Sequence, residues 1–478
     1  MCAEKIKYKK EENIIEWYNT VLTSAEVADF SSVKGFTVYR PYGYRMWEIL
    51  RDALDYDFKA EGVQNSYFPL LIPEKLLKKE KEHVEGFAPE VAWVTKGGNA
   101  ELEEKLAIRP TSETIMYESY SKWIKSYRDL PLLLNQWNTV VRWEIKDTRL
   151  FLRGKEVLWQ EGHCAFATNE EAERNAEKMI RVYAKIVREV LAVPSLVGMK
   201  SESERFAGAV KSYTIETFMP NNYALQCGTS HNLGQNFSKS FDIKFLDEKN
   251  EWHHVFQTSW GLSMRALGAM FMLYGDDRGL VLPPNVAPTQ VVIVPILGKN
   301  DEEILKVSAK IVEELKKEGL RVLLDDRTNY TAGWKFNEYE LKGVPVRIDV
   351  GQKEVASGEI KLKIRFTSSS EIVSLERLKE VKAVLNRVQK DMLESSERRL
   401  ARVIKEERDK ESFITNVSSA AEIAKVAWCG RKECEAGIKE KTKAVSRAIS
   451  IEGEKLIDKK CIFCGRDAVC DAYFSQSY

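Results

Sequence analysis

The sequence predicts a multidomain chain that combines α/β and α+β folds. Three observations support this: a length of 478 residues, a change of texture at the proline-rich segment 282–288, and a cysteine-rich final segment. A chain of this length typically holds about two to four domains. Hydrophobic residues make up 44% and charged residues 30%, as in globular proteins with sizeable cores. We expect domains over residues 1–284, 285–385 and 386–478.

The first region mixes helices and strands. Thr168 and Glu171 are spaced as a capping box, and the apolar residues Met179, Tyr183 and Ile186 follow at helical spacing. An amphipathic helix is therefore predicted after Thr168. The preceding segment, 156–166, alternates as a strand does, so Trp159, Glu161 and His163 should share one face.

The middle region alternates strands and a helix. Strands are predicted at 290–296, 321–326 and 344–350, with a helix at 301–317. Such alternation predicts a small α/β domain with parallel strand pairing. Over 371–412 a charge-rich, helix-like run carries apolar residues every three or four positions, which predicts one packed face on a solvated helix.

The final region holds two close cysteine pairs, Cys429 with Cys434 and Cys461 with Cys464. Pairs spaced in this way are typical of zinc sites, and four thiolates would close the coordination shell of a structural Zn²⁺. Four free buried thiols are the alternative, and Cys470 is a spare candidate ligand. Without a secretion signal, a disulfide framework is not expected.

Charge and motif searches exclude several classes of protein. The net charge is +1, so no global basic field attracts nucleic acid. No apolar run reaches the length of a membrane span, and the charged N-terminus lacks a signal peptide, so we expect a cytoplasmic protein. Neither a G-x-x-x-x-G-K-[ST] loop nor a G-x-G-x-x-G motif is present. A nucleotide would have to be held by arginines instead, since guanidinium groups bind phosphate bidentately.

Three stretches together resemble the prolyl-tRNA synthetase family: RPTSET at 109–114, the segment 140–163, and GTSHNLGQNFSK at 228–239. Two strands joined by a loop, with Arg142 before the loop and Arg153 after it, resemble motif 2 of class II synthetases. Arg265, at the start of a predicted helix rich in small residues, resembles motif 3. Pro69, expected to end a strand, fits motif 1, the dimer interface of the family. The resemblance implies a class II antiparallel-sheet catalytic domain, an α/β anticodon-binding domain and a C-terminal zinc-binding α+β domain.

The resemblance implies an ATP site built on arginines. Arg142 would hold the substrate carboxylate and the α-phosphate, and Arg265 would clamp the γ-phosphate, which makes these two the expected catalytic residues. Arg153 would also hold the triphosphate, Glu144 the adenine end, and Mg²⁺ would bridge phosphates. Gln226 and Thr229 would contact ATP as well. By pattern alone, a hairpin with surface arginines is the alternative.

The resemblance also implies a proline pocket. A secondary ammonium has two donors, and the hydroxyl of Thr111 and the carboxylate of Glu113 are suitable acceptors. A helix start at this T-S-E segment is the alternative. The pyrrolidine ring would meet walls formed by four further residues: Trp159, His163, Phe206 and His231. A lone histidine on such a face is more often structural.

The middle domain would bind the anticodon of tRNA(Pro), with Glu340 and Arg347 as plausible readers or, alternatively, as solvated side chains. Only about 60 residues separate the motif 2 strand from the GTSH segment. This leaves no room for the editing domain of bacterial-type enzymes and implies the archaeal and eukaryotic type. In that type the terminal carboxylate, here of Tyr478, lies toward the catalytic domain. Gly154 and Cys227 depart from the common family residues.

The expected reaction is activation of L-proline by ATP to prolyl-adenylate and pyrophosphate, followed by transfer of proline to the 3′ end of tRNA(Pro). Expected partners are ATP, L-proline, tRNA(Pro) and a second copy of the chain in a homodimer, with neither membrane nor DNA. Three alternative functions are a non-catalytic tRNA-binding paralogue, a synthetase for another amino acid, and a zinc-ribbon nucleic-acid module. The first would lose the arginines or the Thr111–Glu113 pair, all of which this chain keeps.

Overall fold

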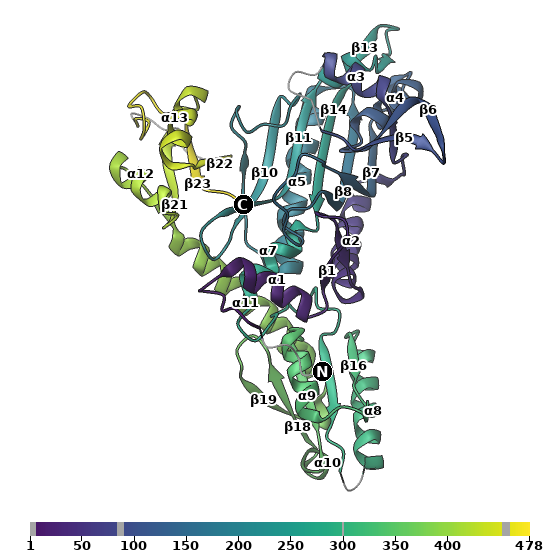
Figure 1. The fold of residues 1–478 in the computed structure, drawn as a ribbon, viewed down its shortest axis with the longest axis vertical. Coiled ribbons are helices and arrows are strands. Elements are labelled where there is room, and N and C mark those ends of the chain that lie inside the picture. Colours follow the sequence, from purple (N-terminus) through teal and green to yellow (C-terminus); the bar gives the residue numbers. More distant parts are fainter. Residues whose placement is uncertain (1–5, 84–89, 299–300, 452–458) are drawn as a thin grey trace.

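A computed structural model describes residues 6–83, 90–298, 301–451 and 459–478. Figure 1 shows three parts: a large sheet with its helices, an α/β domain below it, and a smaller C-terminal unit at its side. The mixed architecture confirms the predicted fold class. Among the described residues, no helix is long and apolar enough to cross a membrane.

The large sheet has eleven strands in the order β20-β21-β23-β22-β9-β10-β11-β14-β8-β7-β3. Its centre is antiparallel and consists of β9 (Leu196–Met199), β10 (Lys211–Phe218), β11 (Ala224–Gly234), β14 (Phe256–Ser263), β8 (Glu156–Phe166) and β7 (Leu132–Val141). The short edge strand β3 (Gln64–Asn65) pairs in parallel with β7. The sheet therefore offers one broad face built from strands that are distant in sequence.

The predicted capping box is confirmed at the start of α5 (Asn169–Leu191), where the Thr168 hydroxyl accepts from the Glu171 amide. Met179, Tyr183 and Ile186 are buried in the main core, as their spacing predicts. Three further helices contribute to this core, α1 (Ile14–Ser24), α2 (Pro41–Ala60) and α7 (Arg265–Tyr274). Together they fix the back of the central sheet.

Smaller elements frame the sheet. They are the hairpins β1 (Ala28–Phe30) with β2 (Thr37–Tyr39) and β12 (Lys244–Leu246) with β13 (Trp252–His254); the sheet of β4 (Leu71–Pro73), β5 (Trp93–Gly97) and β6 (Ala100–Ile108); and α3 (Glu74–His83), α4 (Glu113–Trp123), η1 (Tyr127–Asp129) and α6 (Asn236–Ser240). Pro69 does not end a strand, contrary to the prediction: β3 already ends at Asn65, and Pro69 lies in the connection between β3 and β4.

The α/β domain confirms the predicted parallel pairing: β15 (Val291–Pro295) lies between β16 (Val322–Leu324) and β17 (Val346–Val350) and pairs in parallel with both. Two antiparallel strands complete this sheet, β18 (Glu359–Ile364) and β19 (Ser370–Ser374). Its helices are α8 (Asp301–Lys317), α9 (Ala332–Leu341) and α10 (Gln352–Ser357).

The helix-like run at 371–412 is shorter than predicted. Its first residues belong to β19 and to the 3-10 turn η2 (Leu375–Arg377), and α11 spans Glu380–Val403. Antiparallel pairing with the preceding strand β18 overrides the helical pattern at residues 370–374. The packed face itself is confirmed, since Val381, Leu385 and Val388 are buried.

The C-terminal unit continues the large sheet. After β20 (Ile404–Glu406) and α12 (Lys410–Ser418) come β21 (Ile423–Trp428), α13 (Lys432–Thr442), β22 (Val445–Ser450) and β23 (Cys470–Ser475). Strand β22 pairs with β9 of the central sheet (Figure 1). The chain end returns to that sheet: the Tyr478 amide donates to the Ala224 carbonyl at 3.1 Å, and Arg149 lies 5.4 Å from the Tyr478 ring.

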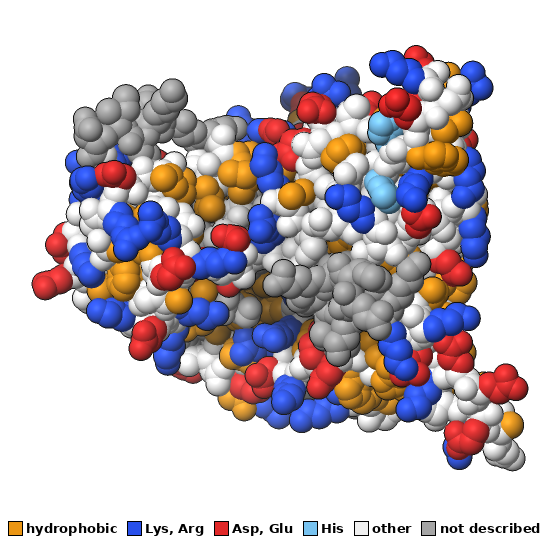
Figure 2. All heavy atoms as spheres, turned by 90° about the horizontal axis from the view of Figure 1, so that it is seen from above, with side chains coloured by type: hydrophobic (Ala, Val, Ile, Leu, Met, Phe, Trp, Pro, Cys, Tyr) orange, Lys and Arg blue, Asp and Glu red, His pale blue; other side chains and the backbone are white. Residues whose placement is uncertain are grey.

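Surface charge is mixed. Figure 2, which looks down on the sheet end of the molecule, shows acidic and basic side chains interspersed on this face. This agrees with a net charge of +1.

Candidate functional site

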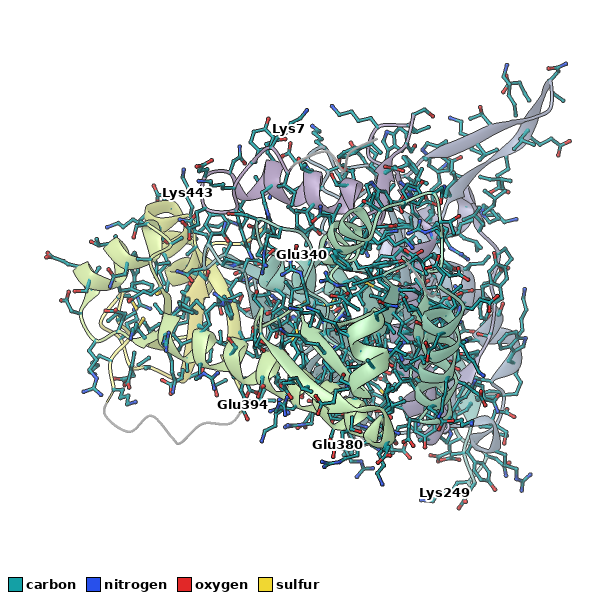
Figure 3. All side chains as sticks on the ribbon, turned by 90° about the horizontal axis from the view of Figure 1, so that it is seen from below. Lys7, Lys249, Glu340, Glu380, Glu394 and Lys443 are labelled. Carbon is teal, nitrogen blue, oxygen red and sulfur yellow. The ribbon has the colours of Figure 1, made fainter. Side chains whose placement is uncertain are left out.

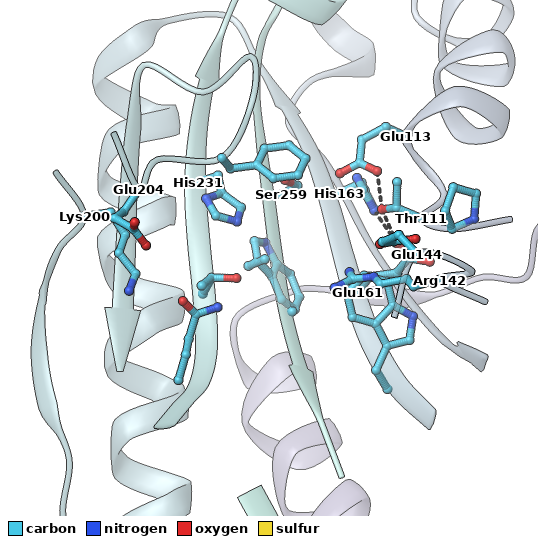
Figure 4. A pocket seen from close by; sticks show the side chains of 17 residues that line it. Thr111, Glu113, Arg142, Glu144, Glu161, His163, Lys200, Glu204, His231 and Ser259 are labelled. Carbon is cyan, nitrogen blue, oxygen red and sulfur yellow. Dashed lines mark hydrogen bonds and ion pairs between the residues drawn. The ribbon is translucent and has the colours of Figure 1, made fainter. Parts of the chain in front are cut away.

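A cavity of about 310 Å³ opens on the face of the central sheet, over β8, β11 and β14 (Figure 4). Ten of the residues predicted for the site line it: Thr111, Glu113, Arg142, Glu144, Trp159, His163, Phe206, Gln226, Thr229 and His231. They come from five separate segments of the chain. The fold therefore brings together the residues that the sequence motifs singled out.

The segment 109–113 is fixed by a buried arginine. Arg109 donates to the carbonyls of Phe68 at 2.7 Å and of Thr139 at 2.9 Å. Helix α4 begins at Glu113, but neither neighbouring hydroxyl caps it with a side-chain bond. Instead, the Thr111 hydroxyl donates to the Glu113 carboxylate, and both residues are buried at the cavity wall. The helix start predicted as the alternative is confirmed, with Ser112 at the N-cap position, but no side chain caps it.

Glu161 is the hub of a buried network beneath this pair. Its carboxylate accepts hydrogen bonds from the hydroxyl and the backbone N–H of Ser112 and from the side-chain amide of Asn138, the last at 2.7 Å. It also lies 3.1 Å from Nε2 of His163. Burial favours the neutral acid, but the bonds from His163, Ser112 and Asn138 hold the pKa of Glu161 well below its usual range. Burial alone would lower the pKa of His163, but the charges of Glu113 and Glu161 outweigh the effect of burial. The pKa of His163 is therefore raised above its usual value. Both shifts favour the ionised forms, and the pair fixes the floor beneath Thr111.

His231 has the opposite electrostatic environment. Burial, with His163 and Lys200 nearby, lowers the pKa of His231 to about 3, so its imidazole is neutral at physiological pH. Its ring stacks on Phe206, with ring centres 4.7 Å apart, and its Nδ1 lies 2.8 Å from the Ser212 hydroxyl. The two rings form a flat, uncharged wall.

Two glycines let tryptophan rings pack closely against the sheet, Gly261 on the cavity face and Gly162 on the opposite face. A Cβ on Gly162 would lie 2.1 Å from the Trp260 ring, and one on Gly261 would lie 3.1 Å from Trp159. On the cavity face, the Arg142 guanidinium lies 5.3 Å from the centre of the Trp159 ring, within cation–π range. Trp159 thus both walls the cavity and orients Arg142.

Arg153 and Arg265 do not line this cavity. They line a neighbouring hollow together with Arg149, Gly154 and Ser263. Arg265 donates to the Leu152 carbonyl at 2.9 Å and to the Gln226 carbonyl at 3.4 Å, which links the hollow to the cavity. Burial, and then the charge of Arg142, lower the pKa of Arg265 to about 10. Arg153 is exposed and Arg265 is half-buried, and arginine side chains that line one hollow suit a polyanionic ligand.

The four predicted cysteines cluster at the C-terminal unit. Their sulfur atoms all lie within 4.8 Å of one another, with 3.7 Å between Cys434 and Cys461 and 3.6 Å between Cys429 and Cys464. Cys470 is outside this cluster and faces the Trp428 carbonyl.

Glu340 and Arg347 share a cavity of about 200 Å³ in the α/β domain, and Figure 3 shows Glu340 from below. Arg278 binds Glu340 at 2.7 Å. Arg347 is held by Asp349 at 2.8 Å and lies 3.9 Å from the centre of the Phe336 ring. The two residues are therefore organised side chains in one hollow rather than freely solvated ones.

Sequence reasoning missed several lining residues. Glu161 was placed on the correct face, and its position between Trp159 and His163 was the available signal, but its role as a hub was not predicted. Lys200, Glu204 and Ser259 also line the cavity, and no motif marks them. Cys227 points into the hydrophobic core, not into the cavity.

Three family models match successive parts of the chain. The tRNA synthetase class II core domain (G, H, P, S and T) matches residues 93–273, an anticodon binding domain matches 290–384, and the prolyl-tRNA synthetase C-terminal domain matches 410–478.

Similarity also extends over the whole chain. Proline–tRNA ligase of Acetoanaerobium sticklandii is 49% identical, over 98% of this chain and 97% of that protein. Proline–tRNA ligase 2 of Clostridioides difficile is 47% identical with the same coverage. A crystal structure of prolyl-tRNA synthetase from Cryptosporidium parvum, complexed with halofuginone and AMPPNP, matches with a TM-score of 0.95 at 40% identity and covers 99% of both chains. A second structure from that organism, with L-proline and AMP, has a TM-score of 0.92 at 38% identity and the same coverage.

Proposed function

The chain belongs to the prolyl-tRNA synthetase family of class II aminoacyl-tRNA synthetases, and we propose that its reaction takes place in the cavity over β8, β11 and β14. The enzyme activates L-proline with ATP to prolyl-adenylate, releases pyrophosphate and transfers proline to the 3′ end of tRNA(Pro). One observation carries the assignment to this cavity: Arg142 and the buried Thr111–Glu113 pair face the same space. The test is charging of tRNA(Pro) with labelled proline, and a protein that charges another tRNA instead would refute it.

The proline side is assigned to the Thr111 end of the cavity. The ammonium of proline would donate to Thr111 and Glu113, and the Glu161 network holds those acceptors in place. The flat wall of Phe206 and His231 would exclude water from the ring. Trp159 and His163, which share a strand face, would complete the pocket.

The ATP side is assigned to the three arginines. Attack of the proline carboxylate on the α-phosphate builds charge on phosphate oxygens, so positioning and neutralisation supply the catalysis and no protein nucleophile is needed. Arg142 would hold carboxylate and α-phosphate, and Arg153 and Arg265 the rest of the triphosphate. Mg²⁺ would enter with the ATP phosphates. Glu144, Gln226 and Thr229, which line the cavity, would hold the nucleoside end.

The tRNA contact is assigned to the α/β domain, with Glu340 and Arg347 reading the anticodon. Their shared hollow supports the assignment, because an arginine held by Asp349 presents its guanidinium in a defined plane. We propose domain boundaries at 1–284, 285–385 and 386–478. Helix α11 crosses the second boundary, so the middle and C-terminal domains share it.

The cysteine cluster fits one structural Zn²⁺. Four sulfurs at about 2.3 Å from a tetrahedral ion lie about 3.8 Å apart, close to the 3.6 and 3.7 Å found here. Cys429, Cys434, Cys461 and Cys464 would hold the ion, which would fix the loop before α13 and the 461–464 turn.

A homodimer and a cytoplasmic location are proposed as well. Tyr56 and Tyr67 are 76% and 71% exposed, and Leu70 beside Pro69 is 40% exposed. Exposed apolar side chains of this kind suit a subunit interface. Light scattering that finds a monomer at micromolar concentration would contradict the dimer.

A non-catalytic paralogue is the second candidate. It would retain the anticodon and zinc regions but lose part of the catalytic set. Arg142, Thr111 and Glu113 line one cavity, and Arg265 lies in the hollow linked to it, so the complete set favours the enzyme.

A further inference from the structure

A row of polar side chains on β10 stands beside the row on β11 that lines the cavity. The register places three pairs opposite each other: Ser212 and His231, Thr214 and Thr229, Glu216 and Gln226. Ser212 binds His231 at 2.8 Å, and the Thr214 hydroxyl donates to Glu216 at 2.8 Å. Strand β10 thus supports the residues that face the substrate.

Glu216 ends this row and binds two cations. One carboxylate oxygen accepts from Lys200 at 2.6 Å, and the other accepts twice from Arg447, at 2.9 and 3.2 Å. The side chains of Lys200, Glu216 and Arg447 are 4%, 0% and 8% exposed. Burial favours the neutral acid, but the charges of Lys200 and Arg447 hold the pKa of Glu216 below its usual range. Burial lowers the pKa of the Lys200 ammonium, and the charge of Glu216 opposes that shift. The three form a dry cluster of two basic groups around one carboxylate.

Arg447 belongs to the C-terminal domain, and its backbone explains how it reaches Glu216. Ser446 pairs with Phe474 and Ala448 pairs with Tyr473, so Arg447 is the extra residue of a β-bulge in β22. Bulges redirect side chains that would otherwise follow the strand alternation. Here the bulge directs the guanidinium to β10, on the far side of β9.

Lys200 is the member of the cluster that faces the cavity (Figure 4). An ammonium has three donors. Two are used, by Glu216 and by the Arg447 carbonyl at 3.2 Å. The third is left for an acceptor in the cavity. Glu204, which also lines the cavity, attracts this ammonium. Among the substrates, the ammonium of proline is repelled by a cation, so the matching substrate acceptor is an oxygen of the nucleotide, next to Gln226 and Thr229.

We propose that Arg447 is a positioning residue of the active site, which acts through Glu216 to aim the Lys200 ammonium at an oxygen of bound ATP. The C-terminal domain therefore completes the ATP side of the catalytic domain. This inference rests on the proposed assignment of Gln226 and Thr229 to ATP. Without Arg447, one oxygen of Glu216 loses both of its charged bonds, and the carboxylate is free to turn away from the orientation that Lys200 requires.

The test uses the full-length zinc-loaded enzyme and three variants of the cluster: Arg447→Ala, Arg447→Lys and Glu216→Gln. Lys432→Ala is the matched control. Lys432 also bridges the two domains, binding Glu202 at 2.9 Å, but both side chains are more than half exposed, at 55% and 53%. Proline-dependent ATP–pyrophosphate exchange is measured while ATP and proline are varied separately, and zinc content and Tm are recorded for each variant.

We expect Arg447→Ala to raise the KM for ATP on the order of 10- to 100-fold, as misplacement of a binding group does, with the KM for proline within about twofold of wild type. Arg447→Lys should recover part of this loss, Glu216→Gln should resemble Arg447→Ala, and Lys432→Ala should match wild type. Zinc content should stay unchanged.

Two results would overturn the inference: a wild-type KM for ATP in Arg447→Ala, or equal changes in both KM values together with a lower Tm, which would indicate a purely structural role. If Arg447→Ala does not fold, Arg447→Lys and Glu216→Gln decide, and wild-type ATP kinetics in both would overturn it. If wild-type enzyme exchanges with proline and Arg142→Ala does not, the proposed function stands whatever the fate of this inference.

Discussion

Arg142→Ala is the change that most directly probes the proposed chemistry. The Arg142 guanidinium lines the cavity and lies 5.3 Å from the Trp159 ring centre, so it is already oriented before substrate binds. Removing a preorganised donor to charge that develops in such a site costs about 3 kcal/mol, on the order of 100-fold in rate. Arg142→Lys should recover little, because one ammonium cannot replace the planar fork.

The assay is proline-dependent ATP–pyrophosphate exchange, with kcat and KM determined separately. Because the interaction strengthens as charge builds on the α-phosphate, kcat should fall more than KM rises. Arg181→Ala is the matched control: Arg181 is a surface arginine on α5, paired with Glu177 at 2.8 Å, and its loss should leave exchange unchanged. Wild-type kcat in Arg142→Ala would refute the role of this residue.

Three other predictions concern the metal, the buried ion pair and substrate selection. Metal analysis should find one Zn²⁺ per chain, lost when Cys429 and Cys434 are both changed to Ser; full occupancy in that double variant would contradict the four-cysteine site. The pKa of His163 is raised by folding, so protonated His163 stabilises the protein fully below its unfolded-state pKa of about 6.5, and this stabilisation is lost as pH rises through the folded-state pKa. The pKa of Glu161 is lowered by folding, so ionised Glu161 stabilises the protein above its unfolded-state pKa of about 4.5, and this stabilisation is lost on acidification. The Tm difference between wild type and His163→Gln should therefore be largest between about pH 4.5 and 6.5 and shrink in alkali, whereas a difference that is constant to pH 9 would show that the pair is not ionised. Finally, apolar walls discriminate a missing methylene by only about 1–3 kcal/mol, so alanyl- or cysteinyl-adenylate should form measurably and mischarged alanyl-tRNA(Pro) should persist; rapid deacylation by the purified protein would reveal an editing site.

Local pattern predicted much of the fold. The capping box at Thr168, the apolar spacing that follows it and the three strands of the middle domain all depend on neighbours in sequence, and all are confirmed. The helical prediction over 371–412 was wrong at both ends, because residues 370–374 pair with β18 and residues 404–406 form β20, which pairs with β21. The prediction that Pro69 ends a strand was also wrong, because β3 pairs with β7 only at Gln64 and Asn65.

The residues of the candidate site also fall into those that the sequence predicted and those that it did not. The resemblance to the prolyl-tRNA synthetase family identified ten lining residues, because its motifs carry those positions. Glu161 and Lys200 carry no such mark: one acts through hydrogen bonds to residues of other segments, and the other through a carboxylate on β10 and an arginine 247 positions later. The attachment of β22 to β9 was equally invisible, because a strand edge has no sequence signature for its partner.

The central claim is that this cavity activates proline. Pyrophosphate exchange should be measured with purified protein, ATP and each of the twenty amino acids in turn, without tRNA. We predict exchange with proline far above that with any other amino acid, weak signals with alanine and cysteine, and loss of the proline signal in Arg142→Ala. Absence of exchange with proline, or a stronger signal with another amino acid, would contradict the account.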